Sequence, residues 1–386
     1  MSFEFMTSGR IIFGAGALAQ IGALAKDMSA RKQIFITTGG SAGRAEPLVA
    51  LLSEAGLGAT VYPVRGEPTV ETVLKGVDAL KEAGADVVIG FGGGSALDTG
   101  KAVAALASNP GDPFDYLEIV GKALPLKAPP LPFIAVPTTA GTGSEATRNS
   151  TLAVPEQRVK VSLRSPMMLP RIALLDPQLA VSVPPEVTAS EGMDAITQVI
   201  EPLVSSKANA MTDALCREGI MRGARSLRRA YSYPDDLKAR EDMALTALFS
   251  GMALANAGLG AVHGFAGPLG GMYPIAHGVI CARLLPIVME VNIRALRLRQ
   301  PESAVLTRYD EVARLVTGDV NAKADDGVAW AYALREALAI PALGGFGIVP
   351  DDYADIVAKA GRANSMKGNP LPLTDEELTE IIDKAC

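Results

Sequence analysis

The stretch DVVIGFGGGSALD, residues 86–98, decides the fold class that we expect for this chain. Its apolar run ends at Phe91, and three glycines and a serine separate that run from the helix-forming residues that begin at Ala96. A buried strand that passes through glycines into a helix is the repeating unit of a parallel α/β sheet. Free backbone N–H groups and the positive end of the helix dipole meet at such a loop. We therefore predict a phosphate site here; a tight turn without a ligand is the alternative.

Similar units lie on both sides of this loop. Runs of strand character occupy residues 33–37, 59–64, 86–91, 133–136 and 172–175. Helical stretches separate the first three of these runs, at residues 47–55 and 70–82. Because strands and helices alternate along the chain, we predict a mostly parallel sheet with helices as the crossover connections.

The chain changes character at Val183-Pro184-Pro185. Strand signals nearly disappear after this point, and long helical stretches follow at residues 186–204, 208–230, 237–257 and 279–296. We therefore expect two domains, an α/β dinucleotide-binding domain over residues 1–184 and an all-α domain over residues 185–386.

The composition excludes several classes of protein. Hydrophobic residues make up 48% of the 386 residues and charged residues 20%, which is typical of a folded globular chain. With 36 basic and 42 acidic residues the net charge is −6, so nucleic acid is not an expected partner. Three scattered cysteines imply neither a disulfide framework nor a thiolate metal cage, and no secretory signal opens the chain, so we expect a cytoplasmic protein. The uncharged stretch Met243 to Ala282 is too interrupted by glycine and proline to span a membrane.

A second glycine-rich loop, PTTAGTGSE at residues 137–145, follows the strand-like run at residues 133–136. Four of the seven residues from Thr138 to Ser144 carry hydroxyl groups. Taken alone, this pattern is equally typical of an exposed cluster of hydroxyl-stabilised turns. Together with the first loop, it predicts a crevice at the switch point of the sheet, where dinucleotides bind.

The only two histidines of the chain, His263 and His277, both lie in the uncharged stretch. Pro268 and Pro274 separate them, so we expect them on two helical segments. A single buried histidine is usually a satisfied core residue, but two so close together suggest a divalent metal. Asp194 is the candidate carboxylate ligand, and Gln198, four residues later, faces the same way on a helix.

Four motifs in this order resemble the iron-containing (group III) alcohol dehydrogenases. They are GGGSALDTGK at residues 92–101, the loop at residues 137–145, GMDA at residues 192–195, and VHGFAGPLGG at residues 262–271 with His277-Gly278. The resemblance implies a dinucleotide-binding α/β domain followed by a helical domain, an architecture shared with dehydroquinate synthase, with metal and substrate in the cleft between them. It also implies an NAD(P)-dependent, metal-assisted oxidoreductase that interconverts alcohols and aldehydes or ketones by hydride transfer.

The resemblance also implies roles for individual residues. The implied cofactor-binding residues are Thr38, Gly39, Gly93, Gly94, Ser95, Asp98, Thr138, Thr139, Thr142, Asn149 and Lys160. Asp194, His263 and His277 are implied as the catalytic metal ligands, and Gln198 occupies the position of the family's usual fourth ligand, a histidine. In the family the metal, here Fe²⁺ or Zn²⁺, acts as a Lewis acid on the alcohol or carbonyl oxygen, and the nicotinamide accepts the hydride.

Three departures from the family pattern matter. The amide of Gln198 is a weaker ligand than imidazole, so we expect three strong ligands and an open position, as in catalytic zinc sites and in the related glycerol dehydrogenases. Gly267 stands where the family often has a histidine near the substrate. Thr38 replaces the aspartate that usually binds the ribose, so a 2′-phosphate is not repelled, and Ser41 or Arg44 is available to contact it. We therefore favour NADP over NAD.

Other interpretations stay open from the sequence. A maleylacetate-reductase-like, metal-independent reductase is the main alternative, and a dehydroquinate-synthase-like lyase or a catalytically silent nucleotide-binding protein are others. Asp98 either orients the phosphate loop or pairs with Lys101, and we interpret Cys281 as a core residue. The expected partners are a small alcohol or aldehyde substrate and, because an edge strand is predicted near Ile11, a second copy of the chain in a homodimer.

Overall fold

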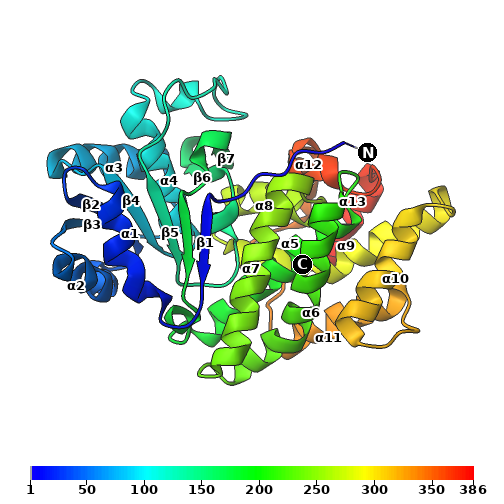
Figure 1. The fold of residues 1–386 in the computed structure, drawn as a ribbon. Coiled ribbons are helices and arrows are strands. Elements are labelled where there is room, and N and C mark those ends of the chain that lie inside the picture. Colours follow the sequence, from blue (N-terminus) through cyan, green and yellow to red (C-terminus); the bar gives the residue numbers. More distant parts are fainter. Residues whose placement is uncertain (1) are drawn as a thin grey trace. The chain divides into compact units, whose positions relative to one another are not determined.

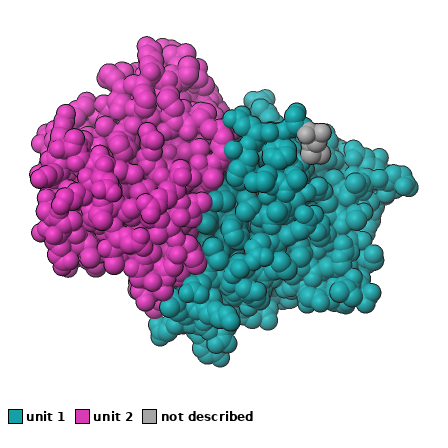
Figure 2. Space-filling model, viewed as in Figure 1, with its two compact units in different colours: residues 1–5, 140–142, 183–386 teal, residues 6–139, 143–182 magenta. Residues whose placement is uncertain are grey.

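The computed structural model describes residues 2–386, which form two compact units. Figure 1 shows the helices and strands, and Figure 2 shows the two units in different colours. The α/β unit contains Met6–Thr139 and Gly143–Ser182. The helical unit contains Val183–Cys386 together with Ala140–Thr142 and the N-terminal residues up to Phe5. The second glycine-rich loop, residues 137–145, is called the hydroxyl-rich loop below. It contributes residues to both units.

Six parallel strands form the sheet of the α/β unit. In the order in which they pair, they are β1 (Arg10–Phe13), β8 (Ile172–Leu175), β5 (Phe133–Pro137), β4 (Val87–Gly92), β2 (Gln33–Gly39) and β3 (Gly58–Val64). The parallel sheet predicted from the alternation of strands and helices is confirmed. β1 lies at one edge of the sheet, where Ile11 pairs with Ala173 on one side only.

Helices cover both faces of this sheet (Figure 1). They are α1 (Ile21–Met28), α2 (Glu46–Glu54), α3 (Val70–Ala83) and α4 (Gly94–Ser108). Ile34 and Ile36 of β2 share a hydrophobic core with α1 and α2, whereas Phe35 belongs to the core under α3 and α4. Successive side chains of a strand point to opposite faces, so the uninterrupted apolar run of β2 supplies both cores.

The order of the strands reverses between β2 and β4, which pair side by side. At their carboxyl ends the backbones approach closely, because a Cβ added to Gly92 would lie 3.2 Å from the amide nitrogen of Gly39. α4 begins directly after this point with Gly93 as its N-cap, a residue that has no side chain to cap the first N–H groups. Uncapped N–H groups at a switch point are the feature that binds the phosphates of a nucleotide.

Two antiparallel strands, β6 (Asn149–Val154) and β7 (Val159–Arg164), form a hairpin that the sequence analysis did not predict. Every second residue of β6 is buried, as expected for a strand with one face on the core. The connection includes Arg158, whose φ of 51° lies in the left-handed region. The hairpin carries Asn149 and Lys160, two of the residues expected to bind the cofactor.

The helical unit is built around α5 (Pro185–Val204). The other helices of this unit are α6 (Ala210–Ser232), α7 (Leu237–Ala257), α8 (Ala261–Met272), α9 (His277–Arg299), α10 (Ala304–Thr317), α11 (Ala324–Ala337), α12 (Tyr353–Arg362) and α13 (Asp375–Ala385). α5 packs against α6, α7 and α9 and is buried over nearly all of its length from Thr188 onward. A polar side chain on such a helix is removed from water, so it needs a partner inside the protein.

The uncharged stretch of the sequence forms α8 and the segments beside it. α8 continues through Pro268 to Met272, and residues 273–276 separate it from α9. His263 and His277 therefore lie on two helices, as expected. Taken singly, no helix among residues 2–386 is both long and apolar enough to cross a bilayer; α7 and α8, which meet at a bend of 99°, satisfy that test of length and composition only as a pair.

Candidate active site

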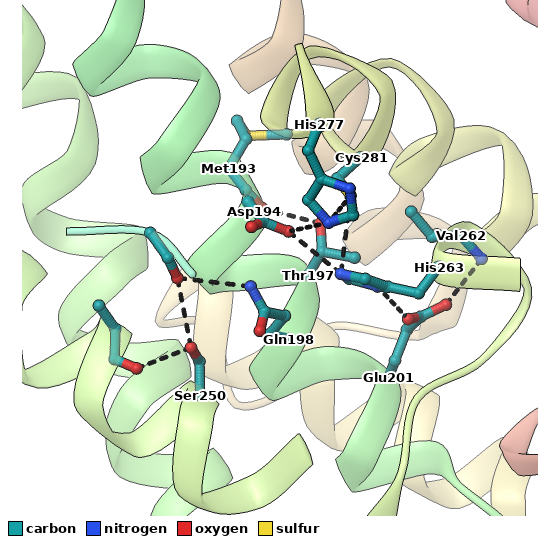
Figure 3. Close-up of polar contacts among 12 residues, drawn as sticks. Met193, Asp194, Thr197, Gln198, Glu201, Ser250, Val262, His263, His277 and Cys281 are labelled. Carbon is teal, nitrogen blue, oxygen red and sulfur yellow. Dashed lines mark hydrogen bonds and ion pairs between the residues drawn. The ribbon is translucent and has the colours of Figure 1, made fainter. Parts of the chain in front are cut away.

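Four potential metal ligands converge inside the helical unit, and Figure 3 shows them from three helices. α5 supplies Asp194, α8 supplies His263, and α9 supplies His277 and Cys281. One donor atom from each of these residues lies within 4.8 Å of the donor atoms of the others. Of the ligands predicted from the sequence, Asp194, His263 and His277 are thus brought together.

The imidazole of His263 is the centre of this cluster. Its Nε2 lies 3.1 Å from Oδ1 of Asp194 and 3.6 Å from the sulfur of Cys281. Nε2 of His277 lies 3.9 Å from the same Asp194 oxygen and 3.6 Å from the same sulfur. The two imidazole rings are tilted against each other with their centroids 5.4 Å apart. Side chains from three helices therefore surround one point.

Glu201 binds the far side of the His263 ring. Its Oε2 lies 2.7 Å from Nδ1 of His263, and its Oε1 accepts a hydrogen bond of 2.8 Å from the backbone N–H of Val262. A carboxylate at Nδ1 favours the tautomer that has its proton on that nitrogen, which leaves the lone pair of Nε2 for a metal ion. A carboxylate behind a ligating histidine is the usual support of a metal-bound imidazole.

The sequence analysis missed Glu201, although a signal was available. Asp194, Gln198 and Glu201 are spaced by four and then three residues on α5, so all three lie on one face of the helix. A similar signal was available for Cys281. It follows His277 by one turn of α9, so both side chains lie on the same face of that helix. Cys281 does lie in the hydrophobic core, as interpreted from the sequence, and its sulfur also faces the two imidazoles.

The electrostatics of the cluster favour a cation. Asp194 is fully buried, and its Oδ2 has no hydrogen-bond partner among residues 2–386. Burial alone would raise the pKa of Asp194, but His277 and His263 hold it below its usual value. Burial alone would lower the pKa of His263, but the Cys281 sulfur and the hydrogen bonds to Asp194 and Glu201 raise it well above the usual value. Two buried carboxylates around two imidazoles thus fit a divalent metal, which also supplies a partner for the free oxygen.

Gln198 lies close to the cluster but uses its amide elsewhere. Its Nε2 donates to the carbonyl oxygen of Gly141 at 3.4 Å, and the hydroxyl of Ser250 reaches the same oxygen at 3.5 Å (Figure 3). Gly267, on α8, has open space around it, because a Cβ added there would meet no atom within 4 Å. Gly267 stands where the family often has a histidine near the substrate, and in this chain there is room for a side chain at that position.

The expected nucleotide residues surround the carboxyl ends of β4 and β5. Gly93 caps α4, and Gly94 and Ser95 form its first turn. Thr139, after β5, faces Gly93, because a Cβ at Gly93 would lie 3.1 Å from its Oγ1. Thr138 donates its backbone N–H to the carbonyl oxygen of Gly92 at 3.0 Å. Five of the predicted residues are thus close together in the α/β unit.

Other predicted cofactor residues are placed more variously. Thr38 is buried near the end of β2, with an Oγ1 that has no hydrogen-bond partner in the described part of the chain, and Gly39 ends that strand. Nζ of Lys160 lies 3.0 Å from Oε1 of Glu67. Asn149 opens β6, whereas Thr142 belongs to the helical unit.

Asp98 serves the loops rather than an open site. Its Oδ1 accepts from the hydroxyl of Ser144 at 2.6 Å, and its Oδ2 accepts from the backbone N–H of Thr151 at 2.8 Å. Nζ of Lys101 lies 3.4 Å from the same Oδ1 and also donates to the carbonyl oxygen of Ser144 at 3.0 Å. The pairing with Lys101 considered from the sequence is therefore present, and Asp98 also binds the loop after β5 and strand β6.

The comparisons with known proteins agree on one family. The family model of the iron-containing alcohol dehydrogenases matches residues 8–177, and that of the C-terminal region of the Fe-containing alcohol dehydrogenases matches residues 188–386. Alcohol dehydrogenase 4 of Saccharomyces cerevisiae (strain YJM789) is 35% identical over 377 residues, covering 97% of this chain and 96% of the relative. The 1,3-propanediol dehydrogenase of Citrobacter freundii is 34% identical over 395 residues, covering 99% and 98%. A solved structure of 1,3-propanediol oxidoreductase matches with a TM-score of 0.91 and 30% identity over 100% of both chains.

The fold and the site together define an oxidoreductase that uses a nicotinamide nucleotide. The chain belongs to the iron-containing alcohol dehydrogenase family. The dehydroquinate-synthase-like architecture predicted from the sequence is confirmed, and so is the activity of interconverting alcohols with aldehydes or ketones. The family implies NAD(P) and a divalent metal.

A first prediction concerns Glu201. We expect Glu201→Gln to weaken binding of a divalent metal by about 10–100-fold, because the amide no longer holds His263 in one tautomer as a carboxylate does. Titration of the metal-free protein with Zn²⁺ measures the effect. Glu186→Gln is the matched control, since Glu186 is exposed in the first turn of the same helix. Equal affinities in the wild type and Glu201→Gln would show that the carboxylate does not support the site.

A second prediction concerns pH and Glu145, which is buried at the end of the hydroxyl-rich loop. Burial raises the pKa of Glu145 from 4.5 to about 7, against the opposing effects of a backbone hydrogen bond and Lys101. The folded state then binds more protons than the unfolded state between these values, so the free energy of unfolding falls as pH rises through this window. The fall is on the order of 2–3 kcal/mol.

Denaturant unfolding at several pH values between 4.5 and 8 tests this dependence. We expect Glu145→Gln to remove most of the decline, because a neutral amide does not titrate. Glu156→Gln, at an exposed position in the connection between β6 and β7, should keep it. A wild-type protein whose stability is flat over this range would contradict the prediction.

Proposed function

We propose that residues 1–184 bind the nicotinamide nucleotide and that residues 185–386 hold a divalent metal and the alcohol or aldehyde substrate. The observation that supports this most strongly is the convergence of Asp194, His263 and His277, with Glu201 fixing the orientation of the middle ligand. Asp194, His263 and His277 are the residues that would bind the metal. Bound there, the metal would polarise the substrate oxygen as a Lewis acid.

The protein side chains have separate roles in this proposal. Asp194 and His263 are buried, so the site has a low dielectric constant. Electrostatic interactions with the substrate oxygen are strong in such an environment. The half-buried His277 is the most accessible of the three proposed ligands, so we place the substrate oxygen on its side of the cluster. In oxidation the alcohol carbon loses a hydride to C4 of the nicotinamide and the hydroxyl loses a proton; reduction of the carbonyl reverses both transfers.

The nucleotide is proposed to bind at the switch point of the sheet. Uncapped N–H groups at Gly93, Gly94 and Ser95 suit the pyrophosphate, because the start of α4 also carries the positive end of the helix dipole. The remaining lining residues are proposed to be Thr38, Gly39, Thr138, Thr139, Thr142, Asn149 and Lys160, with Asp98 holding the two loops in position.

We propose that NADP is preferred to NAD. β2 ends in Thr38-Gly39, so no carboxylate stands where it would bind the ribose hydroxyls and repel a 2′-phosphate. Arg44 lies beside the turn that follows, because a Cβ at Gly40 would be 3.8 Å from the central carbon of its guanidinium. A guanidinium in this place suits a phosphate, which it binds through two parallel hydrogen bonds.

We further propose a cytoplasmic homodimer that acts on small alcohols and aldehydes. The unpaired edge of β1 supports the dimer, because an open strand edge offers backbone hydrogen-bonding groups to a second chain. Both Fe²⁺ and Zn²⁺ are compatible with one carboxylate and two imidazole ligands. The relatives named as alcohol and propanediol dehydrogenases support the substrate class without selecting one alcohol.

A third prediction tests the metal. We expect protein purified without chelator to contain about one Fe or Zn per chain and to lose alcohol oxidation on chelation, with recovery when metal is added back. His263→Ala and His277→Ala should each lose the metal and the activity while still binding NADPH, measured by quenching of nucleotide fluorescence. Activity that is insensitive to chelator, in protein without metal, would contradict the proposal and favour a metal-independent reductase of the maleylacetate reductase kind.

A fourth prediction tests the choice of nucleotide. We expect Arg44→Ala to raise the KM for NADPH about tenfold and to change the KM for NADH little, because the variant loses only the charged contact with the 2′-phosphate. Steady-state kinetics with both nucleotides measure the two values, and Arg31→Ala, at an exposed arginine of the same unit, is the control. An equal change for both nucleotides would show that Arg44 does not recognise the phosphate.

A further inference from the structure

Cys281 is the one member of the buried cluster that the proposed function leaves without a role. Its side chain is fully buried, one helical turn after His277. Its sulfur lies 3.6 Å from Nε2 of His263 and 3.6 Å from Nε2 of His277. Asp194 lies next to the same sulfur and, as described above, has one carboxylate oxygen without a hydrogen-bond partner. All four side chains thus face one point, and among the described residues no atom forms a hydrogen bond with Oδ2 of Asp194.

The spacing of these donors matches that of ligands around a single metal ion. A tetrahedral Zn²⁺ has nitrogen ligands at about 2.0–2.1 Å and sulfur ligands at about 2.3 Å, so a nitrogen and a sulfur bound to the same ion lie about 3.5 Å apart. The two observed sulfur-to-nitrogen distances, both 3.6 Å, fit this value. The distances of 3.1 and 3.9 Å from Oδ1 of Asp194 to the two imidazole nitrogens lie on either side of the separation expected for an oxygen and a nitrogen, about 3.4 Å.

On α5, Gln198 does not supply a fourth ligand to the cluster, so a fourth ligand must come from another helix. Gln198 occupies the position on α5 from which another strong donor would come, but its amide nitrogen is directed to the carbonyl oxygen of Gly141. In Figure 3 the amide of Gln198 points away from the two imidazoles, whereas Cys281 points to them. Cys281 of α9 therefore presents the fourth donor, which Gln198 of α5 does not supply.

We propose that the thiolate of Cys281 is the fourth protein ligand of the divalent metal, so that this chain binds it through one carboxylate, two imidazoles and one sulfur. As the sulfur–metal bond forms, the thiol loses its proton to solvent, and the two anionic ligands balance the charge of the ion. With these four residues holding the metal, a substrate oxygen would be the fifth donor. A thiolate is a soft ligand, so the set favours Zn²⁺ over Fe²⁺. This inference rests on the proposed metal-dependent function.

Cobalt substitution tests the sulfur directly. The metal-free protein is loaded with Co²⁺, and its absorption spectrum is recorded for the wild type, Cys281→Ser and Cys216→Ser. Cys216 is the matched control, because it is also a fully buried cysteine of the helical unit but lies on α6. We expect a sulfur-to-cobalt charge-transfer band in the near ultraviolet for the wild type and Cys216→Ser, and loss of that band with retained visible cobalt absorption for Cys281→Ser.

The possible failures are distinguishable. Cobalt bound by the wild type without a charge-transfer band, or a band that persists in Cys281→Ser, would overturn the sulfur ligand and leave the proposed function intact. A wild-type protein that binds no Co²⁺ or Zn²⁺ would overturn both. If Cys281→Ser does not fold, X-ray absorption of the Zn²⁺-loaded wild type decides the matter: a sulfur scatterer at about 2.3 Å supports the proposal, and a shell of nitrogen and oxygen alone contradicts it.

Discussion

The contact between Glu201 and His263, inside a helical core, is the interaction on which the site depends. Two carboxylates, those of Glu201 and Asp194, lie on opposite sides of one buried imidazole. Removing such charges from water is costly unless an opposite charge compensates them nearby. A bound cation provides that compensation, so the features that look unfavourable for stability are those that a metal site requires. The free Oδ2 of Asp194 is the clearest sign of this arrangement.

The rest of the helical unit serves to place these side chains. α5 is buried on almost all sides, and its spacing of Asp194, Gln198 and Glu201 brings three polar groups to one face. α8 and α9 join at the short segment of residues 273–276, so that His263 and His277 approach from two directions. Ligands held by rigid helices keep their geometry when no ion is bound, which favours selective binding.

In the α/β unit, the loop before α4 is shaped by glycines and held in place by Asp98 and Lys101. The proposed phosphate loop is tightly folded: a Cβ at Gly92 would lie 2.7 Å from Cβ of Ala96, and one at Gly93 would lie 3.1 Å from Oγ1 of Thr139, so glycine is needed at both positions. Asp98 and the buried Lys101 then tie the start of α4 to the loop after β5 and to the hairpin. The buried Lys101 and the partly buried Asp98 thus take a structural role here, and in the proposed function the nucleotide is bound by backbone N–H groups.

Much of this organisation could be predicted from the sequence. The strands of the sheet are continuous apolar runs because both of their faces are buried. Such runs can be recognised in the sequence before the fold is known. The two histidines were recognisable because residues 243–282 contain no charged residue, and Asp194 was recognisable as a carboxylate on a predicted buried helix. The hairpin of β6 and β7 was missed because its strands have one buried face and carry polar residues on the other, so neither resembles a buried strand.

Residues that act through the tertiary fold were harder to predict. The spacing of Glu201 from Asp194, and of Cys281 from His277, was visible in the sequence, but the contacts that give these residues a role depend on how α5, α8 and α9 pack. Isolated acidic and cysteine residues have no distinctive local pattern, and the scattered cysteines gave no reason to expect a sulfur in a metal site. Their roles come from packing, which a single sequence does not encode in any short motif.

The central claim is that the buried cluster exists to hold a metal. Diffraction from a crystal of the protein purified without chelator, collected on both sides of the zinc and iron absorption edges, tests it most directly. The account predicts one anomalous peak per chain within bonding distance of Asp194, His263 and His277. A crystal with full nucleotide-dependent activity in solution before crystallisation but no anomalous peak at this place would contradict it.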